Sequence, residues 1–138
     1  MKTHIAMVVT VGGLSWMLNT GHWSALAMDR LTALSMIESG DNDQAIGQAG
    51  EVSRFQIRPL LWVRYCGPYP VTASTNPQAA LRATRAIMDA RCRNFEYRFH
   101  RSPTDFEYYV LWNAPAQIRK PGKAVSERAN RFCNLTTH

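Results

Sequence analysis

The sequence predicts one α+β domain that is mostly helical. Two Pro-containing start signals, Asn76-Pro77 and Ser102-Pro103, precede apolar residues at helical spacing. Only residues 51–57 alternate like a strand. The chain has 138 residues and shows no internal repeat or long linker. We therefore expect a single modest core built from helices, with a small β-hairpin beside them.

The amino-terminal segment has the features of a secretory signal peptide. Lys2 provides a positive charge, residues 5–18 form an apolar run, and Ala25-Leu26-Ala27 fits a cleavage site with small residues. The alternatives are an uncleaved anchor and a misassigned start codon. We predict a signal peptide over residues 1–27, a secreted or periplasmic location, and a domain over residues 28–138. After cleavage no apolar run is long enough to span a membrane.

The first predicted helix of the domain carries a carboxylate on its apolar face. Leu31, Leu34 and Glu38 lie at positions i, i+3 and i+7, and Gly40 ends the helix. Apolar neighbours and the negative end of the helix dipole both oppose ionisation, so we expect a raised pKa for Glu38. A raised pKa suits a general acid near neutral pH. The alternatives are that Glu38 caps the helix end or pairs with an arginine.

The next segments predict a strand and a short helix. Gly47 and Gly50 supply turns, and residues 51–57 then alternate with the period of a strand, beginning at Glu51. Residues 59–66 read as a short helix whose Leu60, Leu61 and Trp62 are available for burial.

Three further helices complete the predicted domain. Asn76 caps a long helix that runs to about Phe99, and Ser102 is the predicted cap of the following one. The last helix spans residues 123–135 and presents apolar residues on one face.

Charge and cysteine content narrow the possible partners. The chain has 16 Lys and Arg against 10 Asp and Glu, a net charge of +6 that suits an anionic polymer. No nucleic-acid-binding motif, metal-ligand spacing or phosphate-binding loop is present, so we expect no nucleic acid, metal or cofactor. The three residues Cys66, Cys92 and Cys133 fit either one disulfide with a free thiol or three buried thiols.

Three motifs in this order resemble the lysozyme superfamily. Glu38-Ser39 matches the catalytic ES of bacterial lytic transglycosylases, and Gln56-Ile57 matches the QI in their GARGLMQI motif. In the STDYGILQINSRWW motif of hen-egg-type lysozymes, the same alignment places Glu51 on the second acid and Trp62 on the second tryptophan. Residues 112–115, WNAP, resemble the YNAG of the transglycosylases. The chain departs from both families at residues 53 and 54, where it has Ser and Arg instead of Gly and an aliphatic residue.

The resemblance implies a lysozyme-like fold and assigns roles to named residues. Glu38 would be the general acid and Glu51 a possible second carboxylate. Trp62 is either a sugar-stacking residue or part of the core, and Asn113 either binds the sugar's N-acetyl group or caps its helix. The substrate-binding residues implied are Ser39, Ser53, Gln56, Trp62, Trp112 and Asn113.

The function implied is cleavage of β-1,4 bonds in peptidoglycan, as a muramidase or a lytic transglycosylase, by a monomer. A second carboxylate favours the muramidase, because the transglycosylases have alanine at the position of Glu51. Three alternatives stay open: a cell-wall-binding or assembly protein without turnover, a chitinase-type hydrolase, and a basic protein that binds polyanions through its arginines.

Overall fold

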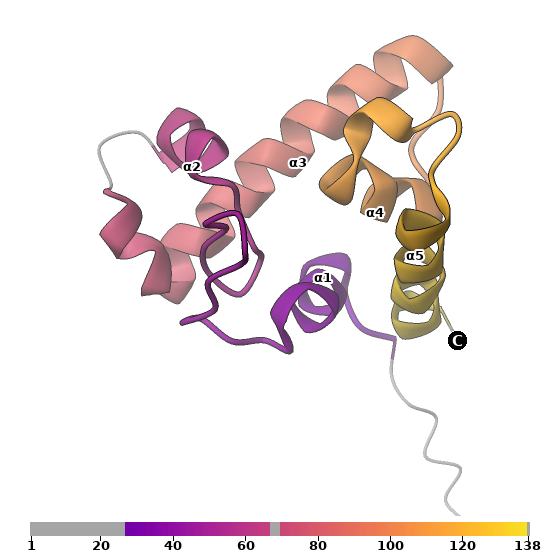
Figure 1. Ribbon diagram of the computed structural model, residues 1–138. Coiled ribbons are helices and arrows are strands. Elements are labelled where there is room, and N and C mark those ends of the chain that lie inside the picture. The colour runs from indigo at the N-terminus through magenta and orange to yellow at the C-terminus, as the bar shows by residue number, and fades with distance from the viewer. Residues whose placement is uncertain (1–26, 67–69, 138) are drawn as a thin grey trace, which may run out of the picture.

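The computed structural model describes residues 27–66 and 70–137, and this part of the chain is mostly helical, as predicted (Figure 1). None of its helices has the length and hydropathy of a membrane span. The predicted signal peptide falls almost entirely outside the described residues. The elements in chain order are α1 (Arg30–Ser39), α2 (Pro59–Cys66), the 3-10 helix η1 (Val71–Thr75), α3 (Pro77–Phe99), α4 (Asp105–Asn113), the 3-10 helix η2 (Pro115–Gln117) and α5 (Lys123–Thr136).

Helix α1 begins and ends at signals that its sequence carries. The Asp29 carboxylate accepts hydrogen bonds from the backbone N–H groups of Leu31 and Thr32 and so caps the first turn. Gly40 follows the last turn with φ 67°, a left-handed conformation that costs glycine little. The helix therefore stops directly after Glu38 and Ser39 and leaves both residues in its last turn.

The predicted β-hairpin is wrong, because the described residues contain isolated β-bridges in place of strands. Val52 forms antiparallel bridges to both Ile46 and Ile57. Between these bridges the chain turns sharply, since Ser53 and Gln56 have φ values of 70° and 52° and the Gln56 N–H donates to the Ser53 carbonyl at 3.1 Å. The turn directs Phe55, which is 3% exposed, into the core. Residues 53–56 therefore form a turn that buries Phe55, and not the strand that the alternating pattern predicts.

The helices pack into one core around α5 and α3. Helices α1 and α4 both pack on α5, and α2 packs on α3 (Figure 1). Phe132 of α5 is fully buried, with its ring centroid 5.9 Å from that of Tyr108 and 5.7 Å from that of Tyr109. This packing places α1 and α4 against the same helix, α5. Residues of α1 and α4 that are far apart in the sequence therefore lie close together.

Helix α4 starts two residues later than the sequence predicts. Its cap is Thr104, not Ser102, and Glu107 completes a capping box by accepting a hydrogen bond from the Thr104 N–H at 2.9 Å. The guanidinium of Arg101 also donates two hydrogen bonds to the Glu107 carboxylate, at 2.6 and 2.7 Å. Together these bonds lower the pKa of Glu107 to about 2.

Glu107→Gln should therefore remove an acid-sensitive contribution to stability. A carboxylate with a lowered pKa in the folded state stabilises the fold above its ordinary pKa, and this contribution is lost as the pH falls toward the folded value. We expect the variant to lose about 1 kcal/mol at neutral pH. Between pH 4.5 and about 2 its stability should change less with pH than that of the wild type. Urea unfolding across this range measures both effects, with the exposed Glu127→Gln as control; parallel curves for wild type and Glu107→Gln would contradict the assignment.

All three cysteines are free thiols. Cys66, Cys92 and Cys133 are half-buried, and burial raises the pKa of each thiol. Cys66 and Cys92 pack against the core. Of the two sequence interpretations, the structure agrees with thiols that act as small apolar residues.

Candidate active site

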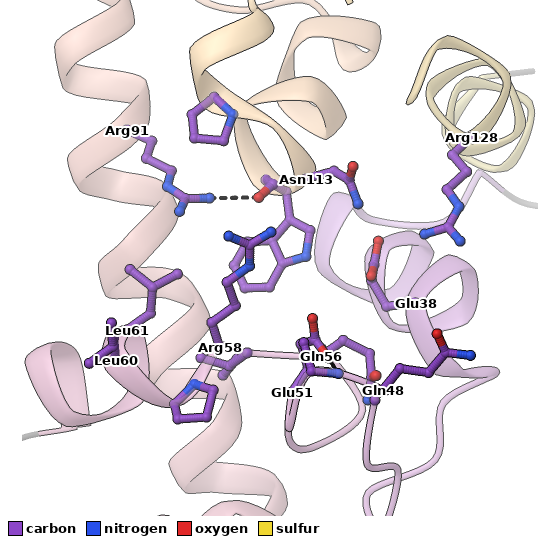
Figure 2. Close-up of a pocket in the computed structure, with 16 residues that line it drawn as sticks. Glu38, Gln48, Glu51, Gln56, Arg58, Leu60, Leu61, Arg91, Asn113 and Arg128 are labelled. Atoms are coloured by element: carbon purple, nitrogen blue, oxygen red, sulfur yellow. Dashed lines mark hydrogen bonds between the residues drawn. The ribbon is translucent and has the colours of Figure 1, made fainter. Parts of the chain in front are cut away.

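A cleft of about 1230 Å³ is lined by residues of all five α-helices, of the 3-10 helix η2 and of the loop before α2; Figure 2 shows this cleft. Glu38 enters it from α1, Glu51 from the loop before α2, and Arg128 from α5. The end of α4 contributes Trp112 and Asn113 to its wall. The cleft thus brings two carboxylates together with the WNAP segment. This segment lies more than sixty residues after either carboxylate in the sequence.

Glu38 lies half-buried in the cleft and is held by a phenol. The Tyr109 hydroxyl donates a hydrogen bond to Glu38 Oε1 at 2.7 Å. Burial is the largest influence on the carboxyl and raises its pKa; the hydrogen bond from Tyr109 and the charge of Arg128 oppose this effect. None of the ion pairs formed by described residues includes Glu38. This environment therefore raises the pKa of Glu38, as the sequence predicts.

Glu51 lines the same cleft, and its charge contributes to the raised pKa of Glu38. The Ala49 N–H donates to Glu51 Oε2 at 3.0 Å, and the Gly47 N–H donates to the Glu51 carbonyl at 2.8 Å. These bonds fix both the backbone and the carboxylate of Glu51. A side chain at Gly47 would occupy the space of the Glu51 carboxylate and would lie 2.6 Å from Gln56 Oε1, so it would displace both groups.

Of the three polar substrate-binding candidates Ser39, Ser53 and Gln56, only Gln56 lines the cleft. Ser39 Oγ donates to the Arg54 carbonyl at 2.8 Å and accepts from the Asn42 N–H at 3.0 Å, so it joins α1 to the loop. Ser53 is 1% exposed, and its hydroxyl accepts from the Phe55 N–H. In this structure both serines shape the loop and neither reaches the cleft, which corrects their predicted role in substrate binding.

The structure separates Trp62 from the other two predicted sugar-binding residues, Trp112 and Asn113. Trp62 is fully buried and does not line the cleft, so the predicted stacking on a sugar is wrong for this fold and the core interpretation holds. Trp112 is 7% exposed and does line the cleft. Asn113 is half-buried in the cleft wall, and the residue that caps α4 is Ala114, whose N–H donates to the Val110 carbonyl. The alternative of Asn113 as helix cap therefore does not apply.

Arg54, where the resembling families have an aliphatic residue, fixes the loop electrostatically. Its guanidinium bonds both carboxylate oxygens of Asp43 at 2.6 Å and Asp41 Oδ1 at 2.8 Å. These contacts lower the pKa of Asp43. Arg54 thus holds the chain between α1 and the turn at residues 53–56.

Several residues of the site were missed by the sequence interpretation. Tyr109 lies four residues before Asn113, so helical spacing alone would have placed both on one face of α4. The cleft also contains Arg58, Arg91 and Arg128, which come from three different helices or their ends and leave no local signal. Among the described residues, no group of His, Cys, Asp and Glu side chains is arranged to hold a metal ion. No family model, curated protein or solved structure matches this chain.

Proposed function

We propose that this chain is an exported glycosidase with a lysozyme-like fold that cleaves β-1,4 bonds of peptidoglycan. The observation that carries the proposal is Glu38, a half-buried carboxyl with a raised pKa that shares a cleft with a second carboxylate, Glu51. Two carboxyl groups in one cleft, one of them with a pKa raised by burial, resemble the pair of acids that glycoside hydrolysis uses.

Glu38 supplies the first proton in this mechanism. Its carboxyl donates the proton to the glycosidic oxygen as the bond to the anomeric carbon breaks. Tyr109 holds one oxygen of the carboxyl, which leaves the other oxygen available for the proton. The positive charge that develops on the sugar ring then meets Glu51, which stabilises it, attacks it or activates a water molecule. In the transglycosylase route Glu38 acts next as a base, the acetamido group of the sugar assists, and an anhydro sugar is released.

Incubation of residues 28–138 with purified peptidoglycan tests the proposal. Mass spectrometry of the soluble products distinguishes the two routes, because hydrolysis yields reducing ends and transglycosylation yields anhydro ends. Release of either product supports a glycosidase. Binding of the polymer without release of fragments would contradict it and would favour the alternative of a wall-binding protein.

Gly47→Ala should lower turnover severalfold by displacing the groups beside it. The new methyl group would push the Glu51 carboxylate and the Gln56 amide from their positions in the cleft. We expect the rate of product release to fall while the melting temperature changes little, since both displaced groups are ends of flexible side chains.

A double-mutant cycle separates this effect from general damage. If Gly47→Ala acts through Glu51, it should lower turnover much less on a Glu51→Gln background than in the wild type. Equal losses on the two backgrounds would show that the displaced carboxylate is not the cause.

A further inference from the structure

Two arginines meet in the cleft on the side away from Glu38. Arg58 precedes α2 and Arg91 lies in α3, and both guanidinium groups reach the same part of the cleft, whereas Glu38 and Arg128 lie on the opposite side (Figure 2). Burial lowers the pKa of Arg91, and the charge of Arg58 contributes to this lowering. The two cations are therefore close enough to repel each other.

The hydrogen-bond partners of Arg91 are backbone carbonyls and include no carboxylate. Arg91 Nη1 donates to the carbonyls of Leu111 and Trp112, both at 2.7 Å, and its Cζ lies 5.8 Å from the centroid of the Trp112 ring. These carbonyls lie in the last turn of α4, where they fix the guanidinium and provide partial negative charge, but no formal negative charge. Within the described residues, neither Arg91 nor Arg58 forms an ion pair with a carboxylate.

Some arginines elsewhere in the described structure do have acidic partners. Arg30 pairs with Asp105 at 2.7 Å, and Arg54 pairs with Asp43 at 2.6 Å. The carboxylates of the cleft itself, Glu38 and Glu51, have Tyr109 and the Ala49 N–H as their hydrogen-bond donors. Arg91 is half-buried and rigidly held and Arg58 is exposed beside it, so an anion that binds between them would offset the repulsion of their charges.

We propose that Arg58 and Arg91 form an anion subsite that binds a carboxylate of the polymer beside Trp112. This inference rests on the proposed function and specifies its substrate. Guanidinium groups bind carboxylates through paired, charge-assisted hydrogen bonds. Peptidoglycan carries carboxylates on its lactyl ethers or on its stem peptides, whereas chitin carries none. The subsite therefore selects an acidic glycan over a neutral one of the same backbone.

Calorimetric binding to defined glycans tests the subsite. The ligands are peptide-free glycan strands with free lactyl carboxylates, the same strands converted to neutral amides, and strands that keep their stem peptides. Binding is measured on a Glu38→Gln background, which prevents cleavage, with and without Arg58→Gln. Arg85→Gln, an exposed change on α3 that removes the same charge outside the cleft, is the matched control.

We expect Arg58→Gln to weaken binding of a carboxylate ligand roughly tenfold and to leave binding of the amide form unchanged. The effect identifies the lactyl carboxylate if it appears with peptide-free strands, and a stem-peptide carboxylate if it appears only with peptide-bearing strands. Arg85→Gln should alter neither. Equal weakening of all forms, no weakening, or no binding of any carboxylate ligand would overturn the subsite.

A parallel turnover assay of the wild type separates this inference from the proposed function. Turnover with no preference for carboxylate ligands would overturn the anion subsite alone. A carboxylate preference that depends on Arg58, in a wild-type protein that releases no fragments, would support the subsite and contradict the glycosidase.

Discussion

Glu38→Gln is expected to reduce turnover of peptidoglycan about a thousandfold or more, because the amide has no proton to donate to the leaving oxygen. The substitution keeps the shape of the side chain, and the amide oxygen still accepts the hydrogen bond from the Tyr109 hydroxyl. The fold and the cleft should therefore survive. The initial rate of fragment release, followed by mass spectrometry at several pH values, measures the loss.

The stability of the same variant tells a lost proton donor from a damaged fold. A carboxyl with a raised pKa in the folded state destabilises the fold once the pH exceeds its unfolded pKa, since the unfolded state then ionises more readily. Removing the carboxyl should therefore leave the melting temperature at pH 7 equal or higher. The exposed Glu127→Gln on α5 is the control and should retain full activity. Retention of a tenth or more of the wild-type rate by Glu38→Gln would remove Glu38 from the mechanism.

The helices were predictable because their signals are local. Asn76 and Pro77 fix the start of α3, and Gly40 fixes the end of α1, through backbone geometry that only neighbouring residues decide. The start of α4 shows the limit of this reasoning. Both Ser102 and Thr104 are good caps, and the choice of Thr104 depends on Glu107, which lies at the third helical position from Thr104 but not from Ser102.

The loop could not be predicted from alternation alone. Residues 51–57 have a strand-like pattern, but Ser53 and Gln56 adopt positive φ values and Phe55 enters the core. Ion pairs of Arg54 with Asp41 and Asp43 hold this turn, and a period-two pattern carries no information about them. Side-chain contacts across eleven or more residues decided the local conformation.

The candidate site was predictable where a residue's role follows from its own helix. The position of Glu38 on an apolar face anticipated its raised pKa, whereas the direction of Trp62 into the core depended on how α2 packs against α3. Helical spacing could have placed Tyr109 on the face of Asn113, but its contact with Glu38 and the meeting of Arg58 with Arg91 arise only after the helices have packed.

Tyr109→Phe should slow turnover about tenfold and move the alkaline limb of the pH profile to higher pH. The phenol donates a hydrogen bond to Glu38 Oε1 at 2.7 Å, and this bond favours the ionised carboxylate. Without it the pKa of Glu38 rises further, so the acid stays protonated to a higher pH. The rate at the optimum falls because the hydrogen bond from the phenol no longer orients the carboxyl toward the glycosidic oxygen.

Tyr108→Phe is the matched control, because the neighbouring tyrosine is buried against Phe132 and its hydroxyl makes no hydrogen bond to Glu38. It should leave the position of the alkaline limb unchanged. A merely structural role for Tyr109 would lower the rate at all pH values without moving this limb. If the alkaline limb of the pH profile moves in Tyr109→Phe and not in Tyr108→Phe, the limb reports the titration of the Glu38 carboxyl. In the described part of the chain no other acid accepts a hydrogen bond from the Tyr109 phenol.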